Sequence, residues 1–180
     1  MGVPGFFIWL IKKYKKEQFF FNIKNNKIIN VDAIYFDTNC LLHPQCFKIL
    51  AENSKLTDKI KLENKMIEEC VKYLNHIIEA TNPSKLIYIS IDGVAPTSKI
   101  KQQRMRRFKS VKTKVLYNNI KKKHKKEIGV DWNNSAITPG TEFMKKITAR
   151  IIEFCKTSIH RKKIIFSSAN TPGEGEHKIL

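Results

Sequence analysis

Four acidic residues follow apolar runs that have the length of buried strands, and their carboxylates could hold metal ions. Asp37 and Asp92 come directly after the first two runs, and Glu174 and Glu176 follow the third. Ligands of open parallel sheets bind at the carboxyl ends of the strands, so we expect the four acids at one edge. Their mutual repulsion calls for a cation. Mg²⁺ (or Mn²⁺) suits them, because carboxylates hold it together with water and phosphate oxygens.

Two such ions about 4 Å apart would activate a water and stabilise the leaving oxygen during phosphodiester hydrolysis. Each acid taken alone has a simpler explanation. Asp92 and Gly93 could form a turn, and Glu174 and Glu176 could be favourable charges at a helix N-terminus. The placement of all four acids after strands favours a metal site.

A basic segment begins soon after Asp92 and contains no acid over residues 97–126. On a helix, its positions i, i+4, i+7 and i+8 share one face, which here carries Lys99, Gln103, Arg106 and Arg107. Paired guanidinium groups bind phosphate oxygens in a bidentate way, so this face suits a terminal phosphate. A small site of this kind could accept a 5′-monophosphate and exclude a cap or triphosphate. The alternative is a solvated helix that binds nucleic-acid backbone without specificity.

The opposite side of this helix is apolar, with Phe108, Val111 and Val115. We expect that side to pack on the sheet and the cationic side to be directed toward Asp92. The distal basic run at 121–126 fits non-specific binding better, or a nuclear-import patch.

The overall charge points to a polyanionic partner. Lys and Arg number 34 against 16 Asp and Glu, which gives a net charge of +18. Such an excess most often indicates nucleic acid, although it could also serve solubility in a lysine-rich chain. His43 follows Asp37 in the sequence, and beside a nucleotide its flat ring could stack on a base. A single histidine, however, is more often an ordinary surface or core residue.

The order of elements favours one α/β domain with a parallel sheet flanked by helices. Helices are predicted over about 4–14, 57–80, 98–126 and 141–157, and strands over 33–37, 86–91 and 163–167. No apolar run approaches the ~20 residues of a membrane span, so we expect no membrane association. The four cysteines lack zinc-site spacing and indicate reduced thiols in an intracellular protein of the cytoplasm or nucleus.

Six motifs resemble the N-terminal conserved region of the Xrn/Rat-type 5′→3′ exoribonucleases. They occur in the family's order and cover nearly the whole chain: Met1-Gly2-Val3-Pro4 with Phe6-Phe7 and Trp9-Leu10; Asp37-Thr38-Asn39 with His43; Asp92-Gly93-Val94-Ala95-Pro96; Gln102-Gln103-Arg104 with Arg106-Arg107-Phe108; Ile137-Thr138-Pro139-Gly140-Thr141 with Phe143-Met144; and Pro172-Gly173-Glu174-Gly175-Glu176-His177-Lys178-Ile179. The related flap endonucleases share the acids but lack the Gln-Gln-Arg and Thr-Pro-Gly-Thr segments, which disfavours a DNA flap nuclease.

The resemblance implies a PIN/flap-nuclease-like α/β fold. It also implies Mg²⁺-dependent release of nucleotide 5′-monophosphates from single-stranded RNA that carries a 5′-monophosphate. It assigns the metals to the four acids, the 5′-phosphate to the four polar residues of the basic helix, and stacking on the terminal bases to His43.

Two departures from the family stand out. Thr97-Ser98 occupies positions where a basic and a small residue are common. In the family, further metal-binding aspartates follow the segment matched by 174–180, and the aromatic residue that closes the base stack comes later. We therefore expect domain 1–180 to be incomplete at its C-terminal end and weak or inactive alone, with a complementing polypeptide as one partner. The alternative function is a truncated, non-catalytic module that binds RNA 5′ ends.

Overall fold

The predicted α/β architecture is confirmed by the computed structural model, which describes residues 5–14, 30–125 and 132–180. The described residues form a parallel three-stranded sheet of order β1-β2-β3, with β1 (Ala33–Asp37), β2 (Leu86–Ser90) and β3 (Ile164–Ser167). Ile87 and Ile89 of the central strand are fully buried. In the register, Asp37 lies opposite Ser90, so the first two strands end together.

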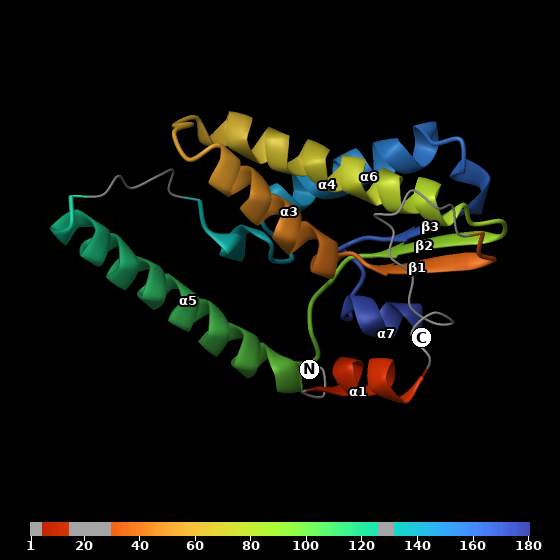
Figure 1. Cartoon of the computed structure of the whole chain (residues 1–180), viewed down its shortest axis with the longest axis horizontal. Coiled ribbons are helices and arrows are strands. Elements are labelled where there is room, and N and C mark those ends of the chain that lie inside the picture. Colours follow the sequence, from red (N-terminus) through yellow and green to blue (C-terminus); the bar gives the residue numbers. More distant parts are fainter. Residues whose placement is uncertain (1–4, 15–29, 126–131) are drawn as a thin grey trace.

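Helices cover both faces of this sheet (Figure 1). Three of them lie on one face, α3 (Asn39–Glu52), α4 (Lys59–Thr81) and α6 (Glu142–Thr157), while the short α7 (Gly175–Ile179) lies on the other. The α1 helix (Phe6–Lys13) confirms the helix expected near the N-terminus. The core forms between the sheet and the three-helix layer, where Leu62, Met66, Leu74, Ile78 and Ile147 are almost completely buried.

Local signals in the sequence explain where two of these helices begin and end. The Asp58 side chain accepts hydrogen bonds from the backbone amides of Ile60 and Lys61 at the start of α4. The helix closes at Asn82, which has a left-handed φ of 37°. As predicted, Thr141 caps α6, and its hydroxyl accepts from the Met144 amide over 3.3 Å.

The α3 helix was not predicted. Pro44 lies inside it, and an interior proline normally argues against a helix because it removes one backbone hydrogen bond. Burial of Leu42, Cys46 and Ile49 outweighs that loss, because they pack in the core with α4. This helix matters to the site, since it begins two residues beyond β1 and carries His43.

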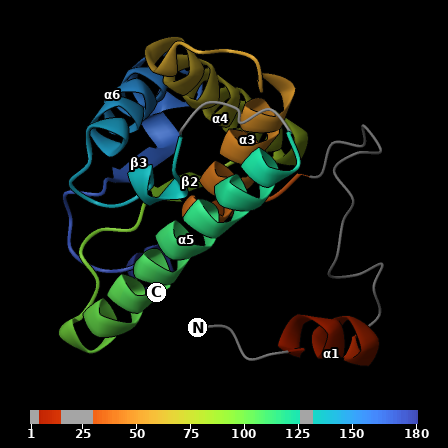
Figure 2. The same cartoon turned by 90° about the vertical axis from the view of Figure 1, so that its left-hand side faces the viewer.

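The expected packing of the basic helix α5 (Thr97–Lys123) was wrong. Phe108 is 69% exposed, Val111 and Val115 are also exposed, and no residue of α5 is buried. The helix runs diagonally beside the body instead of lying on the sheet (Figures 1 and 2). Polar contacts hold it, because Ser110 Oγ donates to Asn134 Oδ1 over 3.3 Å and Lys114 Nζ donates to the Trp132 carbonyl over 2.8 Å.

Two smaller features complete the fold. Ile152, which was expected to face inward on α6, is 38% exposed. On the sheet face that carries α7, Tyr35 and Ile165 remain exposed beside Tyr88. None of the helices formed by 5–14, 30–125 and 132–180 combines the length and apolar character needed to cross a membrane.

Candidate active site

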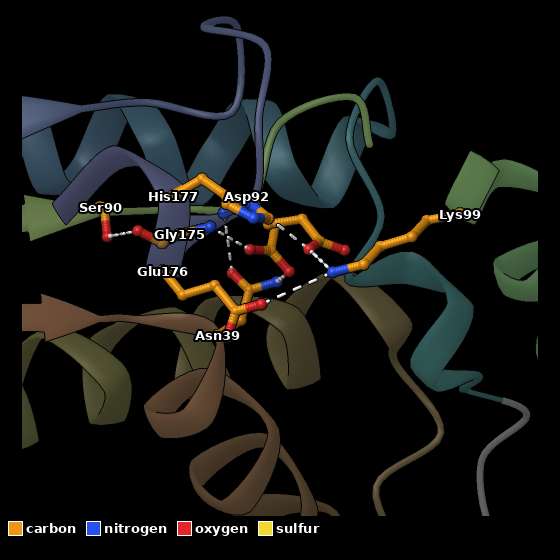
Figure 3. A network of polar contacts seen from close by, with 8 residues as sticks. Asn39, Ser90, Asp92, Lys99, Gly175, Glu176 and His177 are labelled. Atoms are coloured by element: carbon orange, nitrogen blue, oxygen red, sulfur yellow. Dashed lines mark hydrogen bonds and ion pairs between the residues drawn. The ribbon is translucent and has the colours of Figure 1, made fainter. Parts of the chain in front are cut away.

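The short helix α7 brings the late acids to the sheet edge where β1 and β2 end. The buried Ser90 hydroxyl lies 3.1 Å from the Gly175 carbonyl oxygen, and the Gly175 amide donates to Asp92 Oδ1 over 2.6 Å (Figure 3). Glu174 is the residue before this helix, and Glu176 lies in its first turn. One glycine, whose amide bonds Asp92 and whose carbonyl lies beside Ser90, therefore places both glutamates beside the strand ends.

Asp37 and Asp92 converge on this glycine. A Cβ atom added to Gly175 would lie 2.6 Å from Asp37 Oδ1 and 3.3 Å from Asp92 Oδ1. Asp37 Oδ1 is buried and has no hydrogen-bond partner within the described part of the chain. The other oxygen, Oδ2, accepts from the Cys40 thiol over 3.5 Å. Two carboxylates thus lie against one glycine, and Asp37 presents an oxygen that the described residues leave unsatisfied.

The Asp92 carboxyl is held in a fixed orientation. Asn39 Nδ2 donates to Asp92 Oδ2 over 2.8 Å, and the Asp92 amide donates to Asn39 Oδ1 over 3.3 Å. Burial raises the pKa of Asp92, while the hydrogen bond from Gly175 lowers it. The charges of Asp37 and Glu174 raise this pKa further. The carboxylate is therefore ready for a positive partner that would relieve this repulsion.

The two glutamates form a second acidic pair next to the first. Lys99 Nζ donates to Glu174 Oε2. It also lies 3.6 Å from Glu176 Oε1 (Figure 3). His177 Nδ1 lies 3.5 Å from Glu174 Oε2. Donor atoms of Glu174, Glu176 and His177 all lie within 4.8 Å of one another. The sequence reasoning had given His177 no role.

All four acids line one open pocket of about 730 Å³, together with most of the predicted basic residues. The predicted site residues in its wall are Asp37, His43, Asp92, Gln103, Arg106, Arg107, Glu174 and Glu176. Burial lowers the pKa of His43, so its ring is neutral at pH 7, although the charge of Asp92 acts in the opposite direction. The structure thus brings the acids and the cationic helix face together around one space.

Lys99 is the exception among the predicted phosphate-binding residues. Arg107 donates to Gln103 Oε1 over 3.2 Å, and both side chains line the pocket with the more exposed Arg106. Among the residues that the structure describes, Lys99 does not line the pocket. Its ammonium is directed at the two glutamates. Of the four residues expected to bind the 5′-phosphate, three therefore line the pocket. The fourth, Lys99, is paired with the glutamates.

The donor set fits a hard divalent cation. The acids supply carboxylate oxygens, which Mg²⁺ and Mn²⁺ prefer. The unsatisfied Asp37 Oδ1 is the observation that supports this fit. The closeness of Asp37 and Asp92, around a position that has no side chain, supports it further.

Two supporting residues escaped the sequence reasoning, although both lie in the motifs that carry the resemblance. Asn39 orients Asp92, as described above. The Lys178 ammonium donates to the Ile91 carbonyl over 2.7 Å and to the Ser168 carbonyl over 2.9 Å, and so ties α7 to the ends of β2 and β3. Burial lowers the pKa of Lys178, and the nearby charge of Asp92 partly offsets this.

Comparisons with known proteins match the whole length of this chain. The family described as XRN 5′-3′ exonuclease N-terminus matches residues 1–180. The chain is 34% identical over its whole length to 5′-3′ exoribonuclease 1 of Saccharomyces cerevisiae, 30% to 5′-3′ exoribonuclease 2 of the same yeast, and 32% to the 5′-3′ exoribonuclease 2 homolog of Drosophila melanogaster. It spans 12%, 21% and 23% of the length of these three relatives.

Proposed function

Because this chain belongs to the XRN 5′-3′ exonuclease N-terminal family, we propose that it acts in 5′→3′ hydrolysis of RNA that carries a 5′-monophosphate. The observation that supports this most directly is the shared pocket. Its wall combines four carboxylates with a cationic helix face, so a phosphate end and a neighbouring phosphodiester could be engaged together. The names of the relatives, 5′-3′ exoribonucleases, agree with this reaction.

In this proposal the helix face binds the RNA terminus. The Arg106 and Arg107 guanidinium groups would each bind phosphate oxygens in a bidentate way. Gln103, already bonded to Arg107, would hold that guanidinium in place and donate through its amide. A hydroxyl end would leave these donors without an acceptor, which is the physical basis of selectivity for a 5′-phosphate.

The acids would hold the metal ions. Asp37, Asp92, Glu174 and Glu176 are the proposed ligands for Mg²⁺ or Mn²⁺, which when bound would supply an activated water and stabilise the leaving oxygen. The protein's own part is to fix these oxygens. Asn39 and Gly175 hold Asp92, and α7 sets the positions of the two glutamates.

His43 would stack on a terminal base. It lines the pocket from α3, and burial keeps its ring neutral at pH 7, so its flat face can contact a base without an added charge. Such stacking tolerates any base, because every base has a flat face. The released product would be a nucleotide 5′-monophosphate, because the first nucleotide keeps its own 5′-phosphate. The scissile phosphate stays on the next nucleotide, which becomes the new 5′-monophosphate end.

The test uses one RNA sequence with a 5′-monophosphate, a 5′-triphosphate or a 5′-hydroxyl, and the purified chain with Mg²⁺. Decay of the RNA that is selective for the 5′-monophosphate form, and that is abolished by Asp92→Asn, would establish the enzyme activity. Arg106→Ala should reduce monophosphate binding, whereas Arg104→Ala, exposed on the apolar side of α5, should lower binding of all three RNAs equally.

Two other outcomes have definite meanings. Selective binding without decay, weakened by Arg106→Ala, would favour the alternative of a non-catalytic module that binds RNA 5′ ends. Equal binding of the three RNAs would overturn the proposed phosphate pocket and with it the direction of the reaction.

A further inference from the structure

Lys99 joins the first turn of the basic helix to the acidic pair of α7. Its ammonium donates to Glu174 Oε2. The same ammonium lies 3.6 Å from Glu176 Oε1 (Figure 3). The Lys99 side chain is 25% exposed and that of Glu174 only 13%, so this contact is partly shielded from water. The hydrogen bond to Glu174 raises the pKa of Lys99, and the lysine is therefore charged at neutral pH.

The same carboxylate oxygens are proposed ligands for a divalent cation. Glu174 and Glu176 cannot hold both the ammonium and a divalent cation through the same oxygens, because the two cations would repel each other at short range. The two glutamates can therefore pair with the Lys99 ammonium or with a divalent cation, but not with both at once. A lysine is well suited to such an exchange, since its compact charge sits on a flexible four-carbon stem.

The alternative place for the ammonium lies on its own helix. Gln103 is one turn along from Lys99 and lines the pocket beside Arg107. If the glutamates released it, the Lys99 ammonium would lie beside Gln103 on the pocket-facing side of α5. In the present structure the ammonium is bound to the glutamates instead.

We propose that Lys99 is an exchangeable counter-cation, which Glu174 and Glu176 hold in the metal-free protein and release to the 5′-phosphate pocket when they hold a divalent cation. This inference rests on the proposed function of the site. Its consequence is positive coupling: metal and 5′-phosphate each strengthen the binding of the other by the same factor. The protein would grip an RNA end firmly only when the metal needed for hydrolysis is present.

The first experiment imitates the release of Lys99 without any metal. In buffer with EDTA, binding of a single-stranded RNA with a 5′-monophosphate is compared with binding of the same RNA with a 5′-hydroxyl. The substitutions Glu174→Gln and Glu176→Gln should raise the monophosphate-to-hydroxyl affinity ratio about five-fold, the lower end of typical couplings. In a Lys99→Met background the same substitutions should leave the ratio unchanged. An equal gain for both RNAs, or a gain that survives Lys99→Met, would overturn the inference.

The second experiment measures Mn²⁺ binding by calorimetry in the absence of RNA. Lys99→Met removes the competing ammonium, so Mn²⁺ should bind about five-fold more tightly, the lower end of typical couplings. Lys101→Met is the matched control, because Lys101 lies on the same helix against the exposed apolar side and should leave Mn²⁺ affinity unchanged. Unchanged or weaker Mn²⁺ binding in Lys99→Met would contradict the exchange.

The two proposals fail in different ways. Loss of the wild-type preference for a 5′-monophosphate would refute the phosphate pocket itself. A preserved preference that neither Mn²⁺ nor the glutamine substitutions alter would refute only the exchange, and would leave Lys99 as a fixed ion pair between α5 and α7. If the double glutamine variant fails to fold by circular dichroism, Glu174→Gln alone provides the same comparison, because Glu174 accepts the hydrogen bond from Lys99.

Discussion

The backbone amide of Gly175 donates a 2.6 Å hydrogen bond to Asp92 Oδ1, and this contact links the first residue of α7 to the loop after β2. No side chain separates the two segments, so the helix comes close to the strand ends. The position of Glu174 and Glu176 relative to Asp92 therefore depends on a single small residue.

Gly175→Ala should disrupt the site. Its Cβ would meet Asp37 Oδ1 at 2.6 Å and Asp37 Cγ at 3.2 Å, so either α7 or the aspartate must move. Overpacking of this kind typically destabilises a fold by about 1–3 kcal/mol. We expect a lower free energy of unfolding in urea and weaker Mn²⁺ binding by calorimetry.

Gly140→Ala provides the control for this variant. A Cβ at Gly140 would meet no atom within 4 Å, but its φ of 89° strains any L-residue. It should therefore reduce stability through the backbone alone and leave Mn²⁺ affinity intact. Equal Mn²⁺ affinity in both alanine variants would show that Gly175 does not position the acids.

Asn39→Ala should weaken metal binding although Asn39 is not a proposed ligand. The change removes the 2.8 Å hydrogen bond to Asp92 Oδ2 and the acceptor for the Asp92 amide. Loss of a residue that orients a ligand typically reduces metal affinity by about 10–100-fold. Mn²⁺ titration checks this, with Asn75→Ala as the control, because Asn75 bonds the exposed Glu79 on α4. Unchanged affinity in Asn39→Ala would mean that Asp92 keeps its orientation without it.

The sequence was sufficient to predict the sheet and the location of the acids, because both follow from local patterns and one topological rule. The apolar strand before Asp92 is bounded by Asn82-Pro83 and Asp92-Gly93, and parallel strands end at a common edge. The α3 helix escaped prediction because its stability comes from tertiary burial of Leu42 and Cys46, which outweighs the unfavourable Pro44.

The environment of the basic helix could not be read from its periodicity. Spacing shows which residues share a face, but not which face meets the rest of the protein. The helix contacts the rest of the protein through hydrogen bonds such as that of Ser110 to Asn134. The positions of its apolar residues therefore do not indicate which side of the helix faces the protein. The pairing of Lys99 with Glu174 likewise depends on where α7 packs, which no local pattern of α5 contains.

Lys178→Met should loosen the junction between α7 and the sheet. The ammonium satisfies the carbonyl oxygens of Ile91 and Ser168, and a buried acceptor left without its donor typically costs about 1–3 kcal/mol. We expect a lower free energy of unfolding in urea and faster amide hydrogen exchange at 168–174. Lys85→Met removes only an exposed ion pair with Asp32 and should change stability by less than about 1 kcal/mol. Equal effects of the two variants would exclude a special role for Lys178.

The half-buried ring of His43 should make stability depend on pH. Burial lowers the pKa of His43 from its ordinary 6.5, so the folded protein binds this proton less readily than the unfolded chain. Its contribution to the free energy of unfolding is therefore fully present above pH 6.5 and is lost as the pH falls through the lowered pKa. With EDTA present, the Tm difference between wild type and His43→Gln should shrink below pH 6.5, and His76→Gln, exposed on α4, controls for loss of a histidine. A His43→Gln difference that stays constant with pH would show that the ring titrates alike in both states, and would remove the argument for a neutral stacking group.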